Sequence, residues 1–139
     1  MVTTDEIISL LKERSTIEDL YEDSDIFEQG ITGDDFHEMI DDYAIKYNVN
    51  MDDYLWYFHA DEEGGNNSIG GFFFQPPYKR VKRMPLTPQM LAGFANKGKW
   101  DIKYPVHKIP AKRYDLLINQ ILLIVVLILG IFSVIIYIV

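Results

Sequence analysis

The 139-residue sequence has no cysteine, so it offers neither a disulfide framework nor a thiolate for metal binding or nucleophilic chemistry. Positive charge is scarce in the first half. Residues 1–63 contain nineteen Asp and Glu but three Lys and Arg, a net charge of −16. Such a surface repels phosphates, so we expect no nucleic acid partner there. The N-terminus also lacks the cationic start and continuous apolar run of a secretory signal peptide.

The last nineteen residues, 121–139, carry no charged side chain. An α-helix rises about 1.5 Å per residue, so a helix of this length crosses most of a hydrocarbon core of roughly 30 Å. A soluble chain this small cannot surround such a helix on every face. We therefore predict that residues 116–139 form one transmembrane helix and that the lipid bilayer is a partner of this protein.

Basic residues precede the predicted span. Residues 64–139 contain ten Lys and Arg against two acidic residues, and part of this positive charge is expected to lie across the acidic half. Lys103, Lys108, Lys112 and Arg113 lie within about fifteen residues of the apolar run, the range over which the positive-inside rule acts. The rule predicts a single-pass, tail-anchored protein whose N-terminal part is cytoplasmic.

Three segments carry helix start signals. Thr3 and Glu6 have the spacing of a capping box ahead of an apolar stripe. Thr32, followed by acidic residues, is expected to cap a second helix, and Thr87-Pro88 is typical of the start of another. These signals predict helices over residues 4–14, 33–47 and 88–97.

The segments between these helices are rich in aromatic residues or glycine. Residues 51–59 are expected to form a short helix or an extended segment whose rings fill the core. A flexible loop is predicted over 64–71, and a short extended stretch over Phe72–Phe74. Apolar residues alternate over 100–106, which favours a short strand or extended tail. The predicted fold is mainly α, with a short extended addition before the membrane helix.

No catalytic or metal-binding motif is visible in the sequence. His37, His59 and His107 lie far apart and lack the spacing of zinc ligands. Adjacent acidic residues on a helix point in different directions, so the acidic pairs make poor general acid–base couples. We therefore expect a non-enzymatic protein with no catalytic residue, cofactor or metal.

Acidic residues occupy one face of the predicted second helix, opposite the apolar residues Met39, Ile40 and Tyr43. Such a face either is merely solvated or docks a basic protein, where charge complementarity raises the association rate and selectivity. The candidate partner-binding residues are Asp34, Asp35, Glu38, Asp41 and Asp42.

Residues 17–59 resemble the middle of an acyl carrier protein, with an acidic loop, a glycine and then an acidic amphipathic helix. More closely, the chain resembles a bacterial carrier-like family, domain of unknown function 1493. The resemblance rests on Gly33-Asp34-Asp35, the YNVN turn at 47–50, Tyr57-Phe58 with Glu62 or Glu63 beyond, and PLTPQMLAGFANKGKW at 85–100.

This resemblance covers most of residues 1–104 and implies a small helical, carrier-like domain. Residues 105–115 would then form a basic tether and residues 116–139 the transmembrane helix, in a bacterial inner membrane. The span lies outside the pattern of the family.

Carrier proteins need a serine at the start of the second helix, because phosphopantetheine is attached through its side-chain oxygen. Aligned without gaps the position falls on Gly33, and aligned on the two acids it falls on Asp35, so neither alignment supplies a hydroxyl. The neighbouring Thr32 is expected to act as the helix cap. The sequence therefore favours a membrane-anchored interaction module. The alternatives are a membrane-tethered acyl carrier protein in lipid or acyl metabolism, and a small membrane subunit or immunity-type protein.

Overall fold

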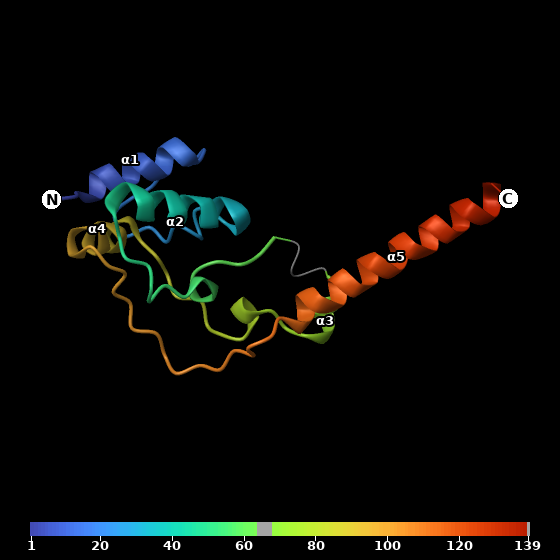
Figure 1. Cartoon of the computed structure of the whole chain (residues 1–139). Helices are drawn as coiled ribbons and strands as arrows, with labels where there is room; N and C mark the ends of the chain where they lie inside the picture. The colour runs from blue at the N-terminus through green and yellow to red at the C-terminus, as the bar shows by residue number, and fades with distance from the viewer. Residues whose placement is uncertain (64–67, 139) are drawn as a thin grey trace.

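The computed structural model describes residues 1–63 and 68–138 (Figure 1). Among these residues no strand forms, and a single parallel bridge joins Asn50 to Lys99. The protein is a small helical domain followed by one long apolar helix, which confirms the predicted fold class. The elements are α1 (Thr4–Arg14), α2 (Gly33–Tyr47), the 3-10 helix η1 (Trp56–Phe58), α3 (Ile69–Phe73), the 3-10 helix η3 (Pro77–Lys79), α4 (Pro88–Lys97) and α5 (Tyr114–Ile138).

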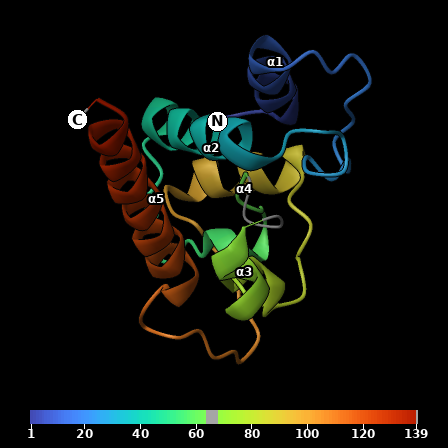
Figure 2. The ribbon, with the colours of Figure 1, turned by 90° about the vertical axis from the view of Figure 1, so that its right-hand side faces the viewer.

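The core of the helical domain lies among α1, α2 and α4, which sit together at one end of the molecule (Figure 2). Each helix buries the apolar side chains that recur along one of its sides. The Tyr43 hydroxyl donates a hydrogen bond of 2.6 Å to the Leu91 carbonyl, which joins α2 to α4. The largest fully buried side chains of this core include Ile7, Leu11, Phe36, Tyr43, Leu91 and Trp100.

The bounds of α1, α2 and α4 agree with the predicted ranges. In α1 the capping box forms as expected, since the Thr3 hydroxyl oxygen accepts from the Glu6 N–H at 3.2 Å. In α4 the Thr87 hydroxyl oxygen accepts from the Met90 N–H at 3.2 Å. Gly98 ends α4 with φ of 70°, a left-handed conformation that glycine adopts without steric strain.

The predicted cap of α2 is wrong in its chemistry. Thr32 occupies the N-cap position, but its side chain makes no capping hydrogen bond. The Gly33 N–H donates instead to the Asp61 carboxylate, Oδ1, at 3.2 Å. A carboxylate near the positive end of the helix dipole replaces the local cap.

The prediction of extended chain at Phe72–Phe74 is wrong at Phe72 and Phe73, because residues 69–73 form the short helix α3, whereas Phe74 after it has extended backbone. The Ser68 side chain caps it by accepting a hydrogen bond from the Gly71 N–H at 3.0 Å. The loop predicted over 64–71 is therefore wrong at its end, and residues 64–67 lie outside the described residues. The sequence pattern misses α3 because its support comes from α5.

Two further segments run between the helices. Residues 51–59 include the 3-10 turn η1, with Phe58 and His59 buried. Residues 100–113 form neither helix nor strand, so they follow the extended-tail alternative. This tail is held against the domain, since the rings of Phe58 and Tyr104 lie 4.8 Å apart and the Tyr57 hydroxyl lies 2.8 Å from His107 Nε2.

The helix α5 projects away from the helical domain as a rod (Figure 1). It begins at Tyr114, two residues before the predicted span. By length and composition it is able to cross a membrane, and its most apolar window is not buried inside the protein. Its side chains from Ile121 onward are mostly exposed apolar groups.

Candidate functional site

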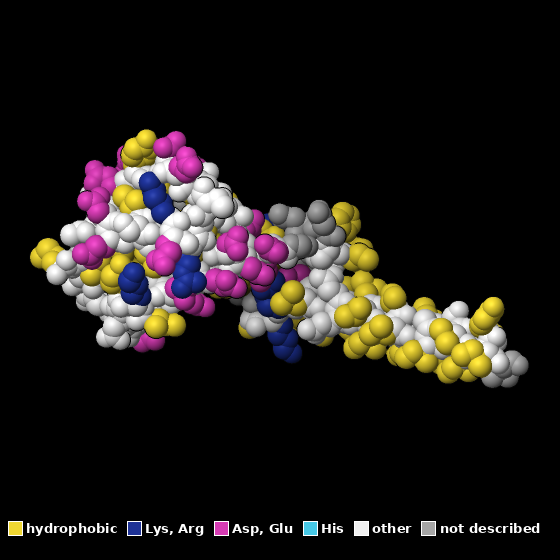
Figure 3. Space-filling view, turned by 90° about the horizontal axis from the view of Figure 1, so that it is seen from above, with side chains coloured by type: hydrophobic (Ala, Val, Ile, Leu, Met, Phe, Trp, Pro, Cys, Tyr) yellow, Lys and Arg dark blue, Asp and Glu magenta, His cyan; other side chains and the backbone are white. Residues whose placement is uncertain are grey.

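Three of the five candidate acidic residues form one line along α2. Asp34, Glu38 and Asp41 are four and three residues apart, so they share a face of the helix. All three are exposed, and among the described residues none of them forms an ion pair. We call these residues the outer acidic row. Acidic side chains spread widely over this side of the domain (Figure 3).

The other two candidates lie nearer α1. Asp42 forms an ion pair of 2.8 Å with Arg14, at the last residue of α1. Asp35 lines a cavity of about 330 Å³ together with Arg14. Asp42 therefore differs from the other four candidates, because it alone forms an ion pair within the described residues. Lining a cavity beside an arginine does not set Asp35 apart, since Asp34 lines another cavity with Arg113.

The outer acidic row stands on a rigid base. On the opposite side of α2, the side chains of Phe36, Met39, Ile40 and Tyr43 are buried in the core. Backbone groups of buried helices move little, so a partner that binds the row need not order it first. The sequence predicted this separation of apolar and acidic faces.

Part of the basic segment lies across other acidic residues, as the sequence predicts. Arg83 contacts Asp25 at 2.7 Å and Glu28 at 2.9 Å, and it lies over the ring of Phe27 at 4.9 Å. These contacts close the acidic loop between α1 and α2 onto the chain before α4. Arg83 makes no ion pair with any residue of the outer acidic row.

The start of α2 is where a carrier protein would hold its prosthetic group. Gly33 is buried with φ of +56°, a conformation that L side chains rarely adopt. A Cβ atom added there would lie 2.5 Å from Cγ of Glu63. Asp35, the other aligned position, is exposed. The backbone conformation disfavours any L side chain at the first position, including serine, and the exposed Glu63 side chain would also have to shift.

Comparison with known proteins does not assign this chain to a family. Family models, curated proteins and solved structures gave no match to this chain. The carrier-like resemblance therefore stays a prediction.

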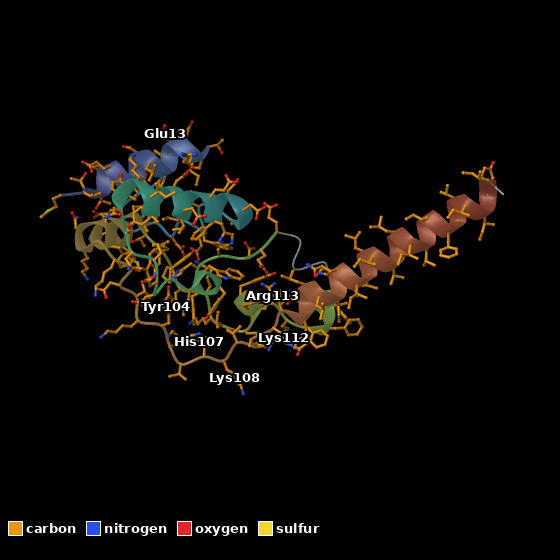
Figure 4. The ribbon with its side chains drawn as sticks, viewed as in Figure 1. Glu13, Tyr104, His107, Lys108, Lys112 and Arg113 are labelled. Atoms are coloured by element: carbon orange, nitrogen blue, oxygen red, sulfur yellow. The ribbon has the colours of Figure 1, made fainter. Side chains whose placement is uncertain are left out.

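An arginine joins the helical domain to α5. Arg113 donates to both carboxylate oxygens of Glu62, at 3.0 and 2.7 Å, and its Nε donates to Asp115 at 2.9 Å. The hydrogen bonds that Arg113 donates to Asp115 and Glu62 raise the pKa of Arg113. A guanidinium shared by two carboxylates has a fixed geometry. Arg113 and Lys112 lie where the extended segment enters α5 (Figure 4).

Close packing between α3 and α5 completes this junction. A Cβ atom added to Gly70 would lie 1.9 Å from the Asp115 carbonyl oxygen, so only glycine fits. The Gly70 N–H donates to the Asn119 side-chain oxygen at 2.8 Å, and the rings of Phe74 and Tyr114 lie 5.6 Å apart. Sequence reasoning missed this joint. Its one visible signal was the pair of polar residues, Asn119 and Gln120, at the start of the apolar run.

The three histidines lie in separate places, and no group of metal-binding side chains gathers within the described part of the chain. His59 is fully buried, with Nδ1 at 3.1 Å from the Met84 carbonyl and Nε2 at 2.9 Å from the Tyr104 hydroxyl. Because a carbonyl only accepts, Nδ1 is the protonated nitrogen and Nε2 accepts from Tyr104. Burial lowers the pKa of His59 to about 4. The residue is a neutral part of the core.

Proposed function

We propose that this protein is a non-enzymatic, membrane-anchored interaction module whose outer acidic row docks a basic surface on a partner protein. The observation that carries this proposal is the exposure of Asp34, Glu38 and Asp41 on a rigid helix, where none of the three forms an ion pair within the described chain. Elsewhere in the chain Arg14, Arg83 and Arg113 each pair with at least one acidic residue. In its extended form, the proposal places α5 across a bacterial inner membrane and the helical domain in the cytoplasm.

The row suits a protein partner because its charges are spaced along a helix. Exposed ion pairs are typically worth ~0.2–1 kcal/mol each, so three pairs govern encounter and selectivity more than absolute affinity. A basic helix or loop would match them, whereas a nucleic acid would be repelled by the excess negative charge.

The test is charge reversal of the outer acidic row, with Asp34, Glu38 and Asp41 replaced by Lys. Partners captured from solubilised membranes by the wild-type chain are purified, and their affinity for both forms is measured at low and high salt. We expect the variant to bind at least about tenfold more weakly, and the wild-type affinity to fall as salt rises.

A matched control reverses three other exposed acids, Asp19, Glu22 and Asp23, in the loop between α1 and α2. It changes the net charge by the same amount but leaves α2 intact. Equal binding by the wild type and the outer-row variant at low salt would show that the row is only solvated. An equal loss of affinity in the outer-row variant and in the control variant would show that binding depends on overall charge and not on the outer acidic row.

The carrier alternative is tested by mass. Intact-mass measurement of the protein purified from its own host is expected to give the unmodified chain, because neither Gly33 nor Asp35 supplies a hydroxyl. An added phosphopantetheine mass would replace the interaction module with a carrier.

The membrane orientation is tested by cysteine labelling, for which this chain has no background. A cysteine after Val139 should react with a membrane-impermeant reagent from outside the cytoplasm. A cysteine replacing the exposed Thr16 should not react. Labelling in the opposite sense would invert the proposed topology.

A further inference from the structure

The short helix α3 presents a cluster of apolar side chains to its surroundings. Ile69, Phe72 and Phe73 are three and four residues apart, so they lie on neighbouring positions of the helix surface. Their exposed fractions are 57, 83 and 68%. Large apolar groups gathered in this way mark a surface that contacts something other than water.

The position of α3 along α5 is fixed by the junction. Gly70 meets the Asp115 carbonyl and bonds to Asn119, so α3 lies level with the first two turns of α5. The depth of α3 in a bilayer is therefore the same as the depth of the first two turns of α5.

That depth follows from the sequence of α5. Asn119 and Gln120 are the last polar residues before the run that begins at Ile121, which has no charge and no polar side chain except those of Ser133 and Tyr137. The described run from Ile121 to Ile138 is roughly 27 Å long at 1.5 Å per residue, close to a hydrocarbon thickness of roughly 30 Å. The whole run is needed to cross the core, so the membrane boundary lies close to Asn119. The exposed side chains of α3 are thus held at the boundary between headgroups and acyl chains.

Basic residues lie on one side of the junction between α3 and α5, while acidic residues that include Glu62 and Asp115 line a separate cavity with Arg113. Arg80 and Lys112 line a cavity of about 110 Å³ beside Phe74 and Tyr114, and Lys79 and Lys108 are exposed nearby in the sequence. Lys and Arg side chains are visible where the domain meets α5 (Figure 3). Cations beside exposed aromatic rings are typical of segments that lie in the interface of an anionic membrane.

We propose that α3 is a second membrane contact, with Ile69, Phe72 and Phe73 inserted into the headgroup–acyl boundary beside the span. This proposal rests on α5 crossing the membrane, which is part of the proposed function. It goes further because it fixes how the helical domain is oriented on the bilayer. The occupant of the α3 surface is lipid, because α3 packs against the first turns of α5, where exposed apolar side chains such as Leu116 and Leu117 lie next to the span.

The test places one environment-sensitive fluorophore at a time on single cysteines of the full chain, in vesicles of phosphatidylcholine and phosphatidylglycerol. The proposal is probed by Phe73→Cys. Ile45→Cys is the matched control, because Ile45 is also an exposed apolar residue, at 80%, but lies on α2. Ser133→Cys reports on the span itself.

We expect the label at 73 to be quenched most by lipids with a nitroxide near the headgroup. Its quenching by aqueous iodide should be at least about threefold weaker than at 45, since interfacial helices bury their apolar face by ~5–10 Å. The label at 133 should respond most to a nitroxide deep in the acyl chains.

Three results would overturn the proposal, each in a recognisable way. If 133 is deep but 73 is as accessible to iodide as 45, α3 lies in water and only this inference fails. If 73 is shielded from iodide yet unaffected by either nitroxide, protein rather than lipid covers α3. If 133 is not quenched by either lipid, the membrane anchor itself fails and the inference fails with it.

Discussion

Protonation of the buried His59 should destabilise the helical domain as the pH falls. In the folded protein the neutral imidazole donates from Nδ1 to the Met84 carbonyl and accepts from the Tyr104 hydroxyl. The Tyr104 oxygen also accepts from the Trp100 indole at 2.8 Å and from the Leu55 N–H at 3.3 Å, so it cannot accept from a third donor. A second proton on the ring would break the Tyr104 hydrogen bond and place a charge in the core.

The size of the effect follows from the two pKa values. The unfolded chain takes up a proton near pH 6.5, whereas burial lowers the pKa of His59 in the folded protein to about 4. Between these values the unfolded state binds more protons, so the free energy of unfolding falls as the pH falls. One pKa unit corresponds to about 1.4 kcal/mol, which gives a total loss of about 3 kcal/mol.

Urea unfolding of the full chain in detergent micelles measures this dependence. Trp100 fluorescence reports the transition, because its ring lies 5.5 Å from that of His59. The wild type should lose stability between pH 6.5 and 4.5 more steeply than His59→Gln, whereas His107→Gln, at an exposed histidine, should keep the wild-type slope. The carboxylates contribute equally to the pH dependence of stability in the wild type and the variants, so the difference between the curves reports on the substituted histidine. Parallel curves for the wild type and His59→Gln would refute the reasoning.

Three other changes test the packing. Gly70→Ala should separate α3 from α5, because the new Cβ atom would clash with the Asp115 carbonyl oxygen, and amide hydrogen exchange in α3 should therefore become faster. The control Gly93→Ala should leave the exchange rate in α3 unchanged, because a Cβ atom there meets nothing within 4 Å. Tyr54→Phe should raise the free energy of unfolding by about 1 kcal/mol, since the buried Tyr54 hydroxyl finds no partner in the described structure, and urea titration would show a loss if that hydroxyl were satisfied. Residues 1–113 alone should give a soluble, helical circular dichroism spectrum because the core contains no residue of α5, and aggregation would show that the junction is required for folding.

The parts of the fold that the sequence predicts are those that local chemistry decides. A Thr at the start and an apolar stripe along one side suffice to define α1 and α4, and a charge-free run suffices to define α5. The acidic face of α2 is likewise visible because it alternates with buried residues.

The missed features depend on residues far apart in the chain. Asp61, not Thr32, satisfies the first N–H of α2 from 28 positions away. The glycine-rich segment around Gly70 has little intrinsic tendency to form a helix, and it does so where Asn119 and Asp115 support it. Asp42 looks equivalent to its neighbours until Arg14 is seen beside it. Local patterns cannot report such pairings.

The rigid joint at Arg113 limits how far the helical domain can move relative to α5. A free linker of about ten residues would let the domain wander over a root-mean-square distance of roughly 17 Å, at a cost in effective concentration. Here the approach to α5 is held by Glu62, Asp115 and Gly70. If α5 spans a membrane as proposed, the outer acidic row would stay at a constant height above the lipid and would diffuse with α5 in the plane of the membrane. A partner would have to present its basic surface at that height, so the height of this surface, in addition to its charge, would restrict which proteins can bind.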